Sequence, residues 1–136
     1  MPDRFIILTW HSVHVHDNRY AANDLVAFSD DLESLDRNGW TILPLSEAWA
    51  RLHRRSLPER CAVLTLDDGS IMDYRRFDHP TCGPQAPIVE RLQAFAGRLG
   101  PGSRHRPHAS AFVIASPEAR AALDRRVTMD LGVWGE

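Results

Sequence analysis

Two adjacent carboxylates, Asp67 and Asp68, end an apolar run in the stretch CAVLTLDDGS, and Gly69 follows them at once. The run before them is typical of a buried strand, on which neighbouring side chains point to opposite faces. A sharp turn at Gly69 would let both carboxylates reach one pocket. A divalent cation would relieve their mutual repulsion, leaving one acid to hold the ion and the other to accept a proton from water. The pair therefore indicates metal-assisted hydrolysis, with an ordinary Asp-Gly turn as the simpler alternative.

Apolar runs alternate with amphipathic segments along the chain. Strands are expected at 5–10, 40–45, 61–66 and 109–115. Helices are expected from a cap at Asn23 to a stop at Asn38-Gly39, from a cap at Ser46 through Leu52, from Pro87 to Leu99, and from a cap at Ser116 onward. A long loop at 69–86 separates the third strand from the third helix. This order predicts an α/β fold, a parallel sheet with outer helices, whose site lies at the carboxyl ends of the strands.

The composition excludes several classes of function. The chain has 136 residues, of which 25% are charged and 43% hydrophobic, as in one soluble domain. A formal net charge of −2 gives no electrostatic reason to bind nucleic acid or an anionic membrane. The apolar run near the N-terminus is too short for a signal peptide or a membrane span, so a cytoplasmic location is expected. Two distant cysteines do not define a disulfide framework.

Three further residues are candidates for contact with a substrate. His11 ends the first predicted strand and should face the same rim as the acidic pair. Trp10 precedes it and is the best candidate among the tryptophans for stacking on a sugar. His79 lies in the loop at 69–86, which either folds over the site or is a proline-rich surface loop.

The remaining histidines are more simply interpreted as solvent-exposed residues of loops. His14 and His16 would share one face of a strand and could chelate a metal, but a solvated loop is favoured because a third ligand is not evident. His105 and His108 lie in an arginine-rich segment that reads as a solvated connection, with a phosphate or sugar contact as the weaker alternative.

Several motifs together resemble a known family. TLDDG (65–69) resembles the T-F-D-D-G motif of NodB-like polysaccharide deacetylases, called carbohydrate esterase family four. ILTWHSV (7–13) is similar to the first strand of that family, and ASAFVIA (109–115) to its A-T-F-F-V strand. The resemblance implies a distorted (β/α) barrel that removes acetyl groups from an amino sugar or polysaccharide with a divalent metal, usually zinc. It makes Asp67 the general base and Asp68 a metal ligand.

The second family motif, His-(Ser/Thr)-x-x-His, is missing, and no histidine follows Ala115. The resemblance therefore covers the first half of the family domain, and residues 1–136 are expected to form one partial, truncated domain. This predicts an incomplete metal site, no deacetylase activity, and a final strand whose open edge leads to marginal stability or self-association.

Two other functions remain open. The chain could be a non-catalytic relic that binds a sugar or a protein partner, as the missing ligands would suggest. A haloacid-dehalogenase-like phosphatase is disfavoured. In such enzymes one residue separates the two acids, which follow a strand near the start of the chain, whereas here the acids are adjacent and follow the third strand.

Overall fold

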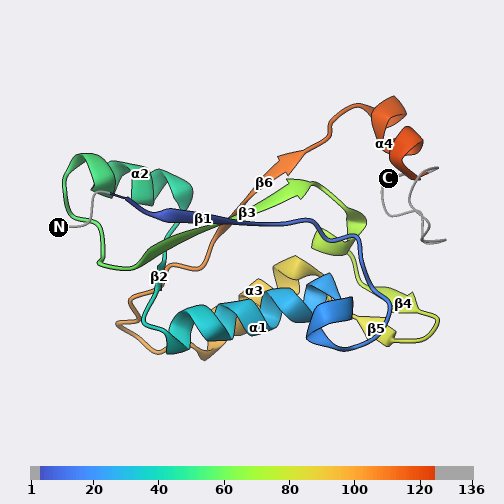
Figure 1. Ribbon diagram of the computed structural model, residues 1–136, viewed down its shortest axis with the longest axis horizontal. Helices are drawn as coiled ribbons and strands as arrows, with labels where there is room; N and C mark the ends of the chain where they lie inside the picture. Colours follow the sequence, from blue (N-terminus) through green and yellow to red (C-terminus); the bar gives the residue numbers. More distant parts are fainter. Residues whose placement is uncertain (1–3, 125–136) are drawn as a thin grey trace.

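Four parallel strands form the central sheet of the chain (Figure 1). The structure is a computed structural model and describes residues 4–124. They are β1 (Ile6–Trp10), β2 (Thr41–Ile42), β3 (Cys61–Asp68) and β6 (Ala109–Val113). β3 is the central strand: it pairs with β1 along one edge, and with β2 and then β6 along the other. The described residues thus form an open parallel sheet, and the predicted α/β class is confirmed.

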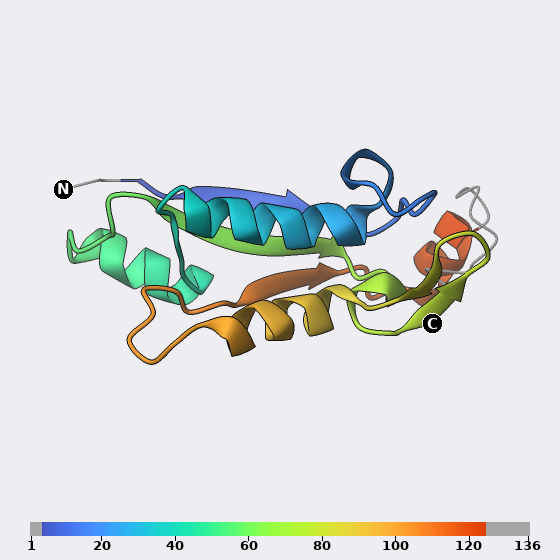
Figure 2. The ribbon, with the colours of Figure 1, turned by 90° about the horizontal axis from the view of Figure 1, so that it is seen from below.

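Helices cover the two faces of this sheet unequally (Figures 1 and 2). α1 (Asp24–Arg37) and α3 (Ile88–Arg98) lie side by side over one face. α2 (Leu45–His53) packs on the opposite face, near the start of β3. α4 (Pro117–Asp124) lies beyond the end of β6 and does not run along that strand (Figure 1). No helix among the described residues is long and apolar enough to cross a membrane.

Alternation along β3 divides the core into two layers. Ala62, Leu64 and Leu66 join the larger cluster under α1 and α3. Cys61 and Val63 join a smaller cluster with Leu43, Ala48 and Leu57 on the α2 side. Cys61 is a free, buried thiol. The strand is buried on both faces until its last two residues, the acidic pair, which are half-buried.

The predicted helix caps are partly confirmed. The Asn23 side chain accepts hydrogen bonds from the backbone N–H groups of Leu25 and Val26, which starts α1. Gly39 follows α1 with a φ of +74°, the left-handed stop expected there. Ser116 caps α4 by accepting from the N–H of Ala119. The cap predicted at Ser46 is wrong, because α2 begins at Leu45 directly after Pro44.

Two segments differ from their predicted structure. The second strand is only Thr41–Ile42, because Pro44 has no N–H to extend the ladder and the helix starts next to it. The loop at 69–86 contains a short 3-10 helix, η2 (Ile71–Asp73), and an antiparallel hairpin of β4 (Phe77–His79) and β5 (Gly83–Gln85). Another 3-10 turn, η1 (Tyr20–Ala22), precedes α1.

The connection before β6 is held by a buried histidine, which corrects the solvated interpretation of His105. This side chain is 5% exposed and lies edge-on against the ring of Phe95. Its Nδ1 accepts from the N–H of Ile42, so its Nε2 carries the proton and donates to Asp36 over 3.0 Å. The hydrogen bond from His105 holds the pKa of Asp36 below its usual value, helped by the charge of Arg104. His105 therefore ties the segment before β6 to β2 and to the end of α1.

Candidate functional site

The acidic pair and His11 meet at the carboxyl ends of β1 and β3. Trp10 pairs with Leu66, so the residue after each partner emerges at the same rim. His11 Nε2 lies 3.7 Å from Asp67 Oδ2 and 4.0 Å from Asp68 Oδ2. These distances exceed hydrogen bonds, and the three side chains are 37–52% exposed, so the attraction between them is weak. The structure thus brings together three of the predicted site residues.

A left-handed turn makes this convergence possible. Asp68 has a φ of +74° and Gly69 a φ of +73°. Regular alternation would send the two carboxylates to opposite faces, but the turn redirects Asp68 so that both approach the same imidazole. The sequence led us to place the turn at Gly69, whereas it begins one residue earlier. A non-glycine residue in this region is strained, although Asp tolerates it better than most.

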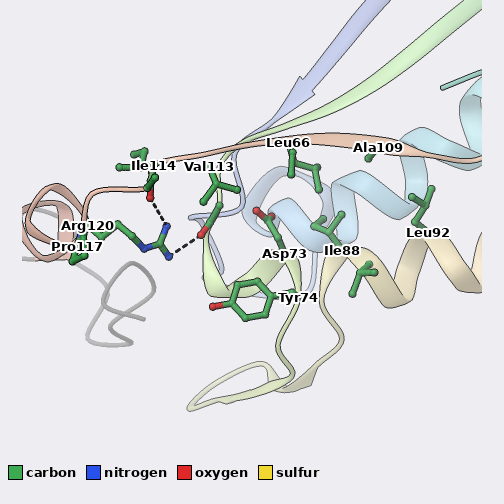
Figure 3. A pocket seen from close by; sticks show the side chains of 14 residues that line it. Leu66, Asp73, Tyr74, Ile88, Leu92, Ala109, Val113, Ile114, Pro117 and Arg120 are labelled. Carbon is green, nitrogen blue, oxygen red and sulfur yellow. Dashed lines mark hydrogen bonds between the residues drawn. The ribbon is translucent and has the colours of Figure 1, made fainter. Parts of the chain in front are cut away.

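Contacts from β6 and α4 hold the strained turn in place (Figure 3). The N–H of Ile114 donates to the carbonyl of Asp68 over 3.1 Å. The guanidinium of Arg120, which is buried, donates to the carbonyls of Gly69 and Asp68 over 2.8 and 3.2 Å. Val113 packs so closely that a Cβ added at Gly69 would lie 2.7 Å from its Cγ1. Sequence reasoning missed Arg120, because nothing distinguishes it from the other arginines of the chain.

A third carboxyl group, that of Asp73, is buried behind the turn. Asp73, at the end of η2, is 7% exposed, and neither of its carboxyl oxygens has a hydrogen-bond partner among the described residues. Burial raises its pKa, and the charge of Asp68 raises it further, while the nearby Ser12 hydroxyl opposes the shift. Asp73 lines a largely apolar hollow of about 570 Å³. Figure 3 shows its side chain near Leu66 and Ile88, which line the same hollow.

The other two predicted substrate contacts lie apart from this cluster. Trp10 turns toward α1, where its Nε1 donates to Asp31 over 3.1 Å and its ring packs edge-on against Phe28. His79 belongs to the β4–β5 hairpin, where its Nδ1 accepts from the N–H groups of Thr81 and Cys82. Neither residue is brought against the acidic pair in this arrangement.

The described residues do not form a complete metal centre. No group of three His, Cys, Asp or Glu side chains within residues 4–124 is placed to hold an ion. The cluster at the rim offers two carboxylates and one imidazole, but these do not converge as a ligand set. The His14 and His16 rings stack with centroids 5.9 Å apart and are exposed, which supports the solvated-loop interpretation. The donors of a zinc site are therefore incomplete here.

Comparison with known proteins leaves the family unassigned. No family model and no curated protein matches the chain. Among solved structures, the Streptococcus pyogenes deacetylase PplD in complex with acetate aligns at 17% identity, over 93% of this chain and 70% of that one, with a TM-score of 0.42. A likeness this slight indicates nothing about the site of this chain.

Substituting Gly69 should reveal how tightly the turn is held. Gly69→Ala should lower the free energy of unfolding by about 1–2 kcal/mol for the left-handed backbone and by roughly 1–3 kcal/mol more for the overlap with Val113. Gly39→Ala is the matched control, because it has the same φ but nothing within 4 Å of its added Cβ. Urea unfolding measures both variants, and equal losses would contradict the close approach. A second change, Val113→Ala, should recover part of the loss at Gly69.

Asp73 should make the stability of the fold depend on pH. Because its pKa is raised, the folded chain keeps a proton that the unfolded chain has lost, so this carboxyl lowers stability as the pH rises above its ordinary value of 3.8. We expect Asp73→Asn to be more stable than the native chain at neutral pH and equally stable at acidic pH below that value. Asp78→Asn, at an exposed carboxylate of β4, is the control and should show no such difference. A neutral-pH stability unchanged by Asp73→Asn would refute the buried-charge interpretation.

Proposed function

We propose that the rim formed by β1 and β3 is a hydrolytic site of the deacetylase type, directed at an acetylated amino sugar or polysaccharide. One observation carries the proposal: a strained turn, held by β6 and α4, gathers Asp67, Asp68 and His11 at the carboxyl ends of parallel strands. Strain of this kind is stored where a particular side-chain placement is needed. The TLDDG motif, which carries the family resemblance, coincides with the turn.

The two carboxylates have different roles in this proposal. Asp67 continues the regular strand and is the general base, accepting a proton from the attacking water. Asp68, redirected by its left-handed backbone, is the metal ligand, and His11 lines the pocket beside both acids. A bound divalent ion, zinc by family resemblance, would supply Lewis-acid activation of the water and of the acetyl carbonyl. The exposure of all three side chains leaves them accessible to a polymeric substrate.

The small number of metal ligands at this site limits the deacetylase activity expected of the chain. Catalytic zinc sites use three protein ligands, and the described residues do not assemble such a group. No histidine follows His108 in the sequence, so residues 1–136 do not contain the two imidazoles of the family motif. The isolated chain should accordingly bind zinc weakly and lack deacetylase activity.

A non-catalytic function is the second candidate. The same incomplete donor set favours it, because a domain that has lost its metal could retain the shape of a sugar-binding rim. The two candidates differ in the cation binding that they predict. A deacetylase-type rim binds a cation through Asp68, whereas a non-catalytic domain does not require one.

Calorimetric titration with zinc tests the assigned roles. We expect weak binding to the native chain, and a loss of roughly tenfold or more in affinity for Asp68→Asn. Asp67→Asn should lose less, because the base is not a ligand, and Asp78→Asn should bind as the native chain does. An affinity unaffected by Asp68→Asn would contradict the proposal. Hydrolysis of an acetylated chitooligosaccharide by this chain with zinc would contradict the predicted inactivity.

A further inference from the structure

The outer edge of β6 has hydrogen-bonding groups that remain unused among the described residues. The N–H of Ile114 donates to Asp68 on β3, and in a parallel ladder alternate residues point to the same neighbour. Ser110 and Phe112 therefore direct their backbone groups at β3, as Ile114 does. Ala109, Ala111 and Val113 direct theirs away from β3, toward the open edge. Such a row of free donors and acceptors is a template for pairing with another strand.

Both faces of β6 are also only partly covered, and its last residues expose apolar side chains. The side chains of Ala109, Ala111 and Val113 line the hollow of about 570 Å³ between α3 and α4 (Figure 3). On the other face, Ser110 lines a second hollow beside Trp49 of α2. Phe112 and Val113 are 56% and 58% exposed, although both are large and apolar. Apolar side chains exposed beside an unpaired strand edge indicate an interface.

The edge lacks the devices that normally prevent pairing. From Pro107 to Pro117 no residue carries a formal charge, in a chain of which 25% is charged. Neither β6 itself nor the two residues after it contain a lysine or a proline, and α4 lies beyond the strand without covering it (Figure 1). Two copies of this edge can therefore approach without repulsion between like charges.

We propose that β6 is the interface of a symmetric dimer, in which it pairs antiparallel with β6 of a second copy about a twofold axis at Ala111. This register uses all three edge-facing residues, because Ala109 lies opposite Val113 of the second copy and Ala111 opposite itself. Each large side chain meets a small one: Val113 faces Ala109, and Phe112 faces Ser110. The edge is thus complementary to itself in size and carries no charge that would oppose the pairing.

The dimer also accounts for the apolar hollows. The two sheets become one continuous sheet, and Ala109, Ala111 and Val113 of the second copy extend the wall of each hollow. An isologous contact of this kind is closed, so association stops at two copies. Pairing of β6 with β1 of another copy would instead leave a free edge at each end and grow without limit.

Light scattering coupled to gel filtration tests the proposal on the full chain. The native chain should elute as a species of twice its 15.4 kDa mass. Phe112→Lys should halve that mass by placing a charge on the edge. Ala111→Pro should do the same by removing the N–H at the twofold axis, which the β3 ladder does not use. Ile7→Lys is the matched control, an exposed apolar residue of the opposite edge strand, and should leave the mass doubled.

Circular dichroism confirms that each variant is folded before its mass is interpreted. The register has its own test: Ala111→Cys in a Cys82→Ser background should form a disulfide-linked dimer on oxidation. A native chain of single mass would overturn the proposal. An open series of polymers, or a mass halved by Ile7→Lys and not by Phe112→Lys, would overturn it as well. A dimer in which Ala111→Cys fails to cross-link would overturn the twofold pairing at Ala111.

Discussion

The left-handed turn at Asp68 and Gly69 is the constraint on which the candidate site depends. A regular strand would separate the two carboxylates by directing them to opposite faces. With φ values of +74° and +73°, the backbone brings both within 4.0 Å of one imidazole nitrogen. This arrangement costs free energy for two reasons: the backbone of Asp68 is strained, and two neighbouring carboxylates carry like charges. We propose that a cation bound by the pair would offset this repulsion.

The same turn connects the site to β6, at the edge of the sheet opposite β1. Its carbonyl groups are held by Ile114 and by the buried Arg120, and its glycine is pressed against Val113. Val113 lies in β6, the strand with the open edge, Ile114 directly follows it, and Arg120 lies in α4. The geometry of the acidic pair therefore depends on how well β6 and α4 are held in place. Anything that covers β6, such as a second copy, would also steady the turn.

Much of the architecture could be predicted from local patterns, because those patterns reflect local physics. The alternation of apolar runs with capped amphipathic segments predicted the parallel sheet and its helices, and Asn23, Gly39 and Ser116 take the roles expected of them. The position of the acidic pair beside His11 followed from the rule that parallel strands end at one rim. These features depend on residues close together in sequence or on general topology.

What could not be predicted depends on distant contacts. Asp68 as well as Gly69 has a left-handed backbone. Ile114 and Arg120, about fifty residues away in sequence, fix the carbonyl groups of this turn. His105 reads as a polar loop residue until Ile42 and Asp36 are seen to enclose it. Trp10 is adjacent to His11 in sequence, yet alternation and the carboxylate of Asp31 turn it toward α1. No short motif contains the information for such contacts.

The central claim is that the turn gathers Asp67, Asp68 and His11 into one rim that attracts a cation. Paramagnetic broadening by Mn²⁺, followed on the backbone amide signals of the labelled chain, tests this most directly. The account predicts that the signals of His11 and of Asp67 to Gly69 broaden first, and that Asp68→Asn abolishes this preference. Broadening that begins instead at His14 and His16, or at the exposed acids of α1, would contradict it.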